Sequence, residues 1–248
     1  LLSAILLGVG LYVRISLTET ADFAAVRAGD ATARFPLLEV LRRYRRNFVL
    51  AFGSRVVDAV AGNLYNAIGV AYIVNTVGLP RSTGLFATTA AMAVQIVYMP
   101  LIGRYSDRIG RKRLYLIGVA ITGLFSFPFF LLLDTGSTVL IWLAMIVGLA
   151  IGSGTEFAVQ STLMTETFPP QVRYTAISLV YQLSAVVGGL TPVAATSLLL
   201  VSDGRPWLVA AALLLVAAIS FACTAGLRRA GGTENRETRH RAVPEESA

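Results

Sequence analysis

The sequence predicts an all-α transmembrane fold with six spanning helices. Of its 248 residues, 55% are hydrophobic and only 14% are charged, whereas soluble proteins average roughly a quarter charged residues. A chain this apolar has too few polar residues to cover a water-facing surface. Six apolar runs each reach the roughly 20 residues that a spanning helix needs. They cover residues 47–76, 83–104, 114–133, 138–164, 174–201 and 206–227.

The segments before and after these runs are expected to differ from the spans. Residues 1–13 are apolar but too short to cross a bilayer, and they lack the cationic start and cleavage site of a signal peptide. We expect them to be the end of a spanning helix in a sequence that is a fragment. Residues 14–46 are polar, and within them 35–44 predicts either a short amphipathic helix on the inner leaflet or a plain solvated linker. The tail, 228–248, is expected to be disordered.

The distribution of cations predicts the orientation. Of 21 Lys and Arg residues, 18 lie in four segments on one side of the predicted membrane: 14–46, 103–113, 165–173 and the tail. Arg81 and Arg205 lie on the other side, and Arg55 lies within a span. Because cationic loops stay on the cytoplasmic side, we expect a multi-pass protein of the cytoplasmic membrane, with residues 14–46 and the tail inside the cell.

The same pattern excludes several classes of function. The net charge of +7 does not indicate nucleic-acid binding, because the cations stand in short clusters beside spans that face the lipid bilayer. Cys223 and His240 are the only residues of their types, which excludes an intramolecular disulfide and a His/Cys metal cluster. The sequence contains no G-x-x-x-x-G-K-[ST] loop, which argues against ATP-driven transport. We therefore expect no enzyme, no metal and no cofactor.

Three motifs resemble those of one transporter family. Residues 103–113, GRYSDRIGRKR, resemble the loop motif G-x-L-x-D-R-x-G-R-[RK]-x of the major facilitator superfamily, with Tyr105 in place of leucine. Residues 165–192 look like E-x-F-P-x-x-x-R-Y-[ST]-x-x-[SG]-L followed by Y-[QN]-x-x-x-x-x-G-G-x-x-P, which the metabolite:proton symporter family carries from the end of helix ten. Residues 18–23 resemble that family's E-T-P-x-F after helix six, with Ala21 replacing the proline.

This resemblance implies a fold and a function. Residues 1–13 would be the end of helix six, 14–46 the cytoplasmic central loop, and 47–227 the six-helix C-terminal bundle, helices seven to twelve. The family implies proton-coupled symport of a small, carboxylated metabolite, an organic acid or zwitterion, by alternating access. The proton gradient would drive transport, and the missing N-terminal six-helix half would be the partner. A non-transporting membrane assembly module and a sensor are the alternatives.

Charged residues inside the spans are the candidate site, since such residues are costly in a bilayer. Arg55 and Asp58 share one helix face three residues apart, roughly mid-membrane, where transporter sites lie. They form either a cavity-lining pair for substrate and proton, which we favour, or a permanent structural ion pair. Asn63 and Asn66 follow on the same helix.

Glu156 is the other carboxylate within a span, with Gln160 one turn away. It is a second proton site, a partner for Arg55, or a carboxyl that burial keeps neutral, since desolvation disfavours the charged form. Tyr181 and Gln182 would donate hydrogen bonds either to a substrate carboxylate or to another helix.

The resemblance also implies residues that control conformation. In that family the loop aspartate and arginines form inter-helix contacts that hold one access state. On this sequence the matching residues are Gly103, Asp107, Arg108, Gly110 and Arg111, with Glu166 as the expected partner and Arg173 in the second motif. Gly188, Gly189 and Pro192 predict a bend in helix eleven, because proline frees a backbone carbonyl.

Overall fold

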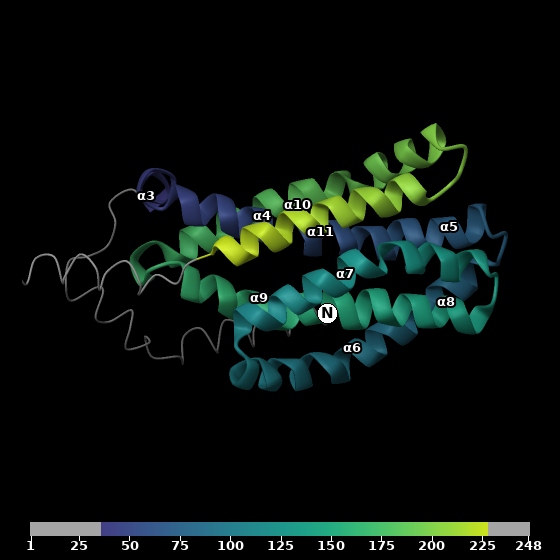
Figure 1. Ribbon diagram of the computed structural model, residues 1–248, viewed down its shortest axis with the longest axis horizontal. Coiled ribbons are helices and arrows are strands. Elements are labelled where there is room, and N and C mark those ends of the chain that lie inside the picture. Colours follow the sequence, from purple (N-terminus) through teal and green to yellow (C-terminus); the bar gives the residue numbers. More distant parts are fainter. Residues whose placement is uncertain (1–35, 228–248) are drawn as a thin grey trace, which may run out of the picture.

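The computed structural model describes residues 36–227. The expectations for residues 1–13, for the first part of the 14–46 segment and for the 228–248 tail fall outside this range. The described part is a bundle of long helices that run roughly side by side, without a β-strand between residues 36 and 227 (Figure 1).

The bundle contains one short helix and six long rods. The short helix is α3, Pro36–Arg43. Four rods are single α-helices: α6 (Arg81–Ile109), α7 (Arg111–Asp134), α10 (Pro170–Val201) and α11 (Trp207–Gly226). The other two rods each contain π-helical turns: α4 (Arg45–Asn63), η1 (Leu64–Gly69) and α5 (Val70–Asn75) form one, and α8 (Thr138–Met145), η2 (Ile146–Ser153) and α9 (Gly154–Thr167) form the other.

All six rods are long and apolar enough to cross a membrane, which confirms the predicted all-α fold with six spans. Their bounds differ from the predicted runs by only a few residues at most ends. The expected loop at 103–113 is the main difference, because α6 continues to Ile109 and α7 begins at Arg111. Gly110 alone separates the two helices, with a φ of +99° that glycine adopts without a steric cost. The motif is therefore almost entirely helical.

The segment before the first span also contains a helix. In α3, Val40 is completely buried, and the helix packs against α10 and α4. The described end of the 14–46 segment is thus a helix docked on the bundle and not a plain linker.

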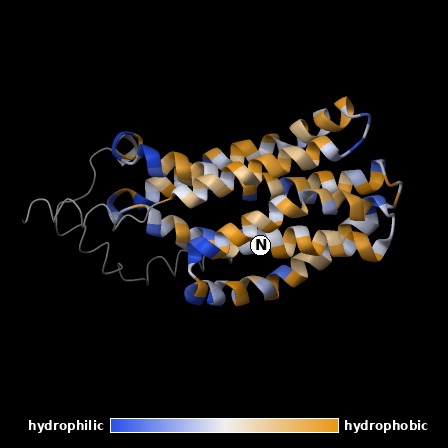
Figure 2. Cartoon of the chain, viewed as in Figure 1, coloured by the Kyte–Doolittle hydropathy of each residue, from blue (hydrophilic) through white to orange (hydrophobic). Residues whose placement is uncertain are grey.

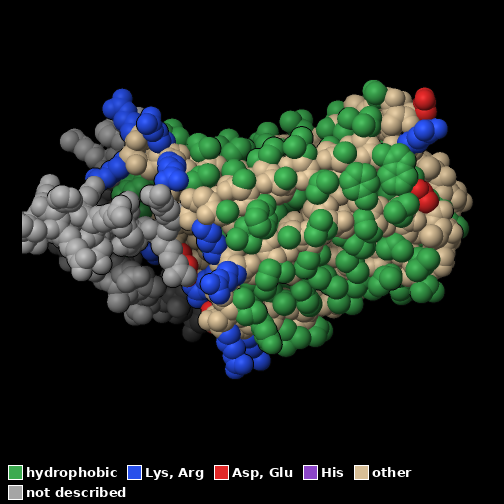
Figure 3. All heavy atoms as spheres, in the orientation of Figure 1, with side chains coloured by type: hydrophobic (Ala, Val, Ile, Leu, Met, Phe, Trp, Pro, Cys, Tyr) green, Lys and Arg blue, Asp and Glu red, His purple; other side chains and the backbone are tan. Residues whose placement is uncertain are grey.

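The bundle is hydrophobic along most of its length and hydrophilic at its two ends. Hydrophobic residues make up most of the length of the helices, and hydrophilic residues are concentrated at their ends (Figure 2). Lys and Arg side chains gather at the end that carries α3 and the α6–α7 junction (Figure 3). An apolar girdle between polar ends fits a bilayer, as expected for a multi-pass membrane protein.

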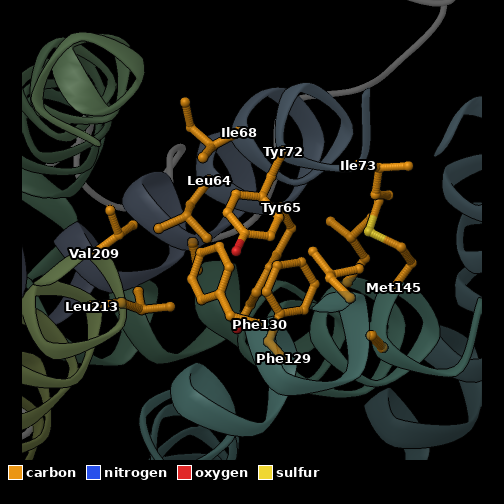
Figure 4. Packing of buried hydrophobic residues seen from close by; sticks show 14 of the residues in the cluster. Leu64, Tyr65, Ile68, Tyr72, Ile73, Phe129, Phe130, Met145, Val209 and Leu213 are labelled. Atoms are coloured by element: carbon orange, nitrogen blue, oxygen red, sulfur yellow. The ribbon is translucent and has the colours of Figure 1, made fainter. Parts of the chain in front are cut away.

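The core consists of two apolar clusters, one towards each end. The cluster near α5 and α8 is aromatic: the ring centroids of Tyr65 and Phe129 lie 4.7 Å apart, and Phe130 packs beside them (Figure 4). The other cluster includes Phe48 and Phe168 near α3.

The buried side chains of Asp58 on α4, Thr122 on α7 and Glu156 on α9 lie where each rod passes from one cluster to the other. Arg55 and Gln160 lie next to them, among residues of the cluster near α3.

Candidate functional site

The candidate site is built around a buried ion pair. On α4, Arg55 Nη1 lies 2.7 Å from Asp58 Oδ2, and each residue is only 9% exposed. The spacing of three residues places both side chains on one helix face. The local sequence therefore positions the pair before any tertiary contact forms.

Residues far along the chain complete this pair. Arg55 Nη1 also donates a hydrogen bond to Gln160 Oε1 of α9 at 2.7 Å, across 105 residues of sequence. Gln160 Nε2 lies 3.4 Å from the Tyr115 hydroxyl, which donates in turn to the Ser54 carbonyl at 2.9 Å. This chain of hydrogen bonds ties α4, α7 and α9 together and fixes the guanidinium of Arg55.

The guanidinium of Arg55 also stacks on an aromatic ring. Its Cζ lies 3.8 Å from the ring centroid of Tyr181 on α10, within cation–π range. Arg55 Nε is buried and has no hydrogen-bond partner among residues 36–227. Because a guanidinium has five N–H donors, Arg55 has donors beyond those that contact Asp58 and Gln160.

Glu156 makes its hydrogen bond outside this network. It is fully buried on α9, and Thr122 of α7 donates a hydrogen bond to Glu156 Oε1 at 2.6 Å. Its second oxygen, Oε2, has no partner in the described part of the chain. The pairing with Arg55, one of the three alternatives for Glu156, is not formed, since Arg55 pairs with Asp58 instead.

Two glycines make the Thr122–Glu156 contact possible. A Cβ on Gly118 of α7 would lie 3.0 Å from Glu156 Cγ, and a Cβ on Gly152 of η2 would lie 2.9 Å from Thr122 Oγ1. Each polar side chain therefore packs over a glycine one turn earlier on the opposite helix. Gly152 lies within the π-helical turns of η2, a distortion frequently found at functional sites.

Three of the predicted pathway residues lie away from this cluster. The side chains of Asn63 and Asn66 are exposed and donate to the carbonyls of Ala59 and Gly62 of their own helix, both at 2.9 Å. Asn63 follows Asp58 by five residues, which is about 140° around a helix, and the π-helical turns of η1 shift the position of Asn66 further. Gln182 is also exposed.

A second polar group ties helices together at the α3 end. Arg111 of α7 forms ion pairs with Glu166 of α9 and, at 3.2 Å, with Asp107 of α6. The structure thus brings together three of the predicted gating residues. Arg108 is exposed, and Arg173 Nε donates to the Phe168 carbonyl at 3.2 Å.

The sequence did not predict one contact at this end, which Lys112 makes with the end of α11. Lys112 Nζ donates to the carbonyls of Ala225 and Leu227 at 2.7 and 2.9 Å. These carbonyls end α11 and would otherwise lack helical partners. The basic motif therefore also holds the last helix of the described chain.

The glycines of helix α10 differ from each other. A Cβ on Gly188 would lie 2.8 Å from the Ala59 carbonyl oxygen of α4, whereas a Cβ on Gly189 meets nothing within 4 Å. Helix α10 continues through Pro192. Gly188 therefore permits close packing of α10 on α4, and the bend remains a prediction.

No metal centre is evident in this part of the chain. Between residues 36 and 227, no group of three His, Cys, Asp or Glu side chains could hold a metal ion. The site contains a buried arginine, a carboxyl group paired with it, and a second buried carboxyl group that is held by Thr122. Buried ionisable groups between spanning helices are typical of ion and substrate pathways.

Comparison with known proteins identifies the family. Residues 48–246 match the Major Facilitator Superfamily, and the chain belongs to this family. Because this is a family of transporters, membership agrees with the expectation that the chain is not an enzyme.

The individual relatives are transporters as well. The chain is 30% identical to a shikimate transporter of Escherichia coli over 232 residues, which are 92% of this chain and 53% of that protein. It is 30% identical to an ectoine/proline transporter of Corynebacterium glutamicum, covering 77% of the chain and 40% of the relative. A putative proline/betaine transporter of Staphylococcus aureus is 28% identical, covering 86% and 46%. The chain spans about half the length of these curated relatives.

Proposed function

We propose that the chain forms the C-terminal half of a proton-coupled symporter for a small carboxylated metabolite, an organic acid or a zwitterion. It would act in the cytoplasmic membrane by alternating access, together with an N-terminal six-helix half. The names of the relatives support this class of substrate, since shikimate, proline and betaine all carry a carboxylate. The concentration of cations at the α3 end supports an orientation with that end in the cytoplasm.

The ion pair of Arg55 and Asp58 is the observation that carries the proposal. Arg55 is buried inside a spanning rod, and its Nε has no partner among residues 36–227, so a substrate carboxylate can bind it through charge-assisted hydrogen bonds. When the substrate competes for Arg55, Asp58 loses its counter-ion. A carboxylate without a partner in a nonpolar interior favours the protonated form. Substrate binding and proton uptake are thereby coupled at one residue pair.

The same proposal gives the second polar group a conformational role. Asp107, Arg111 and Glu166 would hold one access state, and their ion pairs would break and form as the two halves rock about the substrate site. These residues lie at the α3 end of the bundle, away from Arg55. They would therefore change the rate of transport and not substrate affinity.

The test compares two Asp→Asn variants of the complete transporter, in which this chain is joined to an N-terminal half. Asp58→Asn should abolish pH-dependent uptake of labelled shikimate, proline and betaine while leaving the amount of protein in the membrane intact. Asp203→Asn is the matched control, because Asp203 is exposed in the α10–α11 turn and its φ of +52° suits asparagine. Normal pH-dependent uptake by Asp58→Asn would remove Asp58 from the mechanism.

A further comparison separates the alternatives of an assembly module or a sensor. Uptake is measured with this chain alone and with the N-terminal half present. We expect uptake only when both halves are present. Uptake by the chain alone would show that it is a transporter by itself, and no uptake of any organic acid or zwitterion with both halves would favour a non-transporting role.

A further inference from the structure

The number of buried charges bears on the protonation of the two buried carboxyl groups, Asp58 and Glu156. Within the interior of the six rods, away from their ends, the charged residue types are Arg55, Asp58 and Glu156. This set contains one cation and two acids. A region with one uncompensated negative charge inside a bilayer is costly, so the site holds one proton when it is empty of substrate.

The contacts identify the residue that holds this proton. Asp58 Oδ2 lies 2.7 Å from the Arg55 guanidinium, which stabilises the ionised form of Asp58. Among residues 36–227, the Thr122 hydroxyl is the hydrogen-bond partner of Glu156 Oε1, and Oε2 has no partner there. An isolated carboxylate in such a place costs far more than a neutral carboxyl group. The proton therefore belongs to Glu156.

The groups around Glu156 offer no second cation within residues 36–227. On α4 these are Arg55 and Asp58, which pair with each other. The other titratable groups near Glu156 are tyrosines, which are neutral at physiological pH. They are Tyr65 on η1, Tyr115 on α7 and, through a 2.9 Å contact with Thr155, Tyr98 on α6.

The packing also keeps Glu156 out of the reach of water. Its side chain fits over Gly118, and Thr122 fits over Gly152, so the two helices interlock at this point. Glu156 is fully buried, whereas Asp58 is 9% exposed. Of the two carboxyl groups, Asp58 is therefore the more accessible.

We propose that Glu156 stays protonated throughout the transport cycle, and that Asp58 alone takes up and releases the coupling proton, one for each substrate carboxylate bound at Arg55. This inference rests on the proposed function and deepens it. On the outer side, the substrate carboxylate accepts hydrogen bonds from Arg55, and the Asp58 carboxylate takes one proton from a hydronium ion of the outer solution. On the inner side, the substrate leaves, Asp58 gives the proton to water, and its carboxylate pairs with Arg55 again.

This scheme fixes the charge that moves with each substrate. A monocarboxylate anion crosses with one proton, so that no net charge is transferred. A zwitterion crosses with one proton and one net positive charge. The carrier itself returns neutral at this site in both cases, with Arg55 and Asp58 paired and Glu156 protonated.

Infrared spectroscopy of the full chain in lipid bilayers tests the protonation of Glu156 without any transport assay. At neutral pH, we expect a C=O stretching band of a protonated carboxyl that exchanges slowly in D2O. The band should disappear in Glu156→Gln and persist in Asp58→Asn. Should Glu156→Gln fail to fold, Thr122→Val serves instead, because loss of the hydrogen bond to Glu156 Oε1 should shift the same band to higher frequency. A protonated-carboxyl band of Glu156 that appears only at acidic pH would overturn the proposal. So would a band of ionised Glu156 at neutral pH that changes when Na⁺ is added.

Transport currents in proteoliposomes test the assignment of the coupling proton. With the complete transporter, shikimate uptake should carry no current, and proline uptake should carry an inward current. At equilibrium, the shikimate accumulation ratio should rise about tenfold for each unit of pH gradient. Glu156→Gln should leave the pH dependence of uptake unchanged, whatever its rate, whereas Asp58→Asn should remove it.

The outcomes distinguish this inference from the proposed function. If uptake depends on pH and Glu156→Gln abolishes that dependence, symport stands and the permanent protonation of Glu156 is wrong. If neither shikimate nor proline uptake depends on pH, the proposed function fails, and with it the assignment of the coupling proton to Asp58.

Discussion

Replacing Gly188 by alanine would force helix α10 away from α4. The added Cβ would lie 2.8 Å from the Ala59 carbonyl oxygen and 3.0 Å from Ala59 Cβ. These atoms belong to the backbone of α4 or are attached to it directly, so no side-chain rotation relieves the clash. Overpacking of this kind costs typically about 1–3 kcal/mol.

The neighbouring residue provides a matched control. A Cβ on Gly189 meets nothing within 4 Å, although it lies in the same helix. Both Gly→Ala changes gain the same helix propensity, up to about 1 kcal/mol, and this gain cancels in the comparison. Gly188→Ala should therefore be less stable than Gly189→Ala by about 1–3 kcal/mol in the free energy of unfolding.

The free energies can be measured by denaturant titration of the reconstituted chain, followed by circular dichroism. The same spacing of α10 from α4 brings Tyr181 to 3.8 Å from Arg55, two turns before Gly188. In the complete transporter, with the N-terminal half present, a fall in uptake should therefore accompany the loss of stability. Equal unfolding free energies for the two variants would refute the close contact of the helices at Gly188.

Three other changes probe the rest of the structure. Gly110→Ala should destabilise the chain by about 1–2 kcal/mol, because its φ of +99° is unfavourable for alanine. Gly103→Ala is the control and should not destabilise the chain, since a Cβ at Gly103 meets open space. Equal melting temperatures for the two variants would contradict this prediction. Asp107→Ala should lower the turnover rate of uptake and leave the substrate affinity, measured by binding, almost unchanged. Arg104→Ala is the control, because Arg104 is exposed. A large loss of affinity at full turnover would count against a gating role. Thr122→Val should lower the free energy of unfolding by about 1–3 kcal/mol, since it leaves the buried Glu156 without its donor. Thr89→Val, whose hydroxyl is exposed on its own helix, should have a much smaller effect in the same titration.

The features that could be predicted from the sequence are local. Six apolar runs correspond to six spans, because the length and composition of a run alone decide whether it can cross a bilayer. The contact between Arg55 and Asp58 also follows from their spacing along one helix. The helical nature of residues 103–109 was not predicted, because the clustered cations indicated a loop although no helix-breaking residue stands between Gly103 and Gly110.

The remaining contacts of the site could not be predicted. Gln160 was a candidate because it lies one turn from Glu156, but its partner Arg55 lies 105 residues away. Tyr115 and Thr122 gave no signal at all, since a tyrosine or a threonine in an apolar run is ordinary. Asn63 and Asn66 were expected to join Asp58, and the structure turns them outward.

The sequence by itself determined the number of spans, the concentration of cations on one side and the pairing of Arg55 with Asp58. Each depends on residues that are neighbours along the chain. Only the tertiary structure decided that Gln160 and Tyr181 meet Arg55, and that Glu156 faces Thr122. These contacts depend on how far each helix is rotated about its axis, and that rotation is set by packing between helices, at contacts such as Gly118, Gly152 and Gly188.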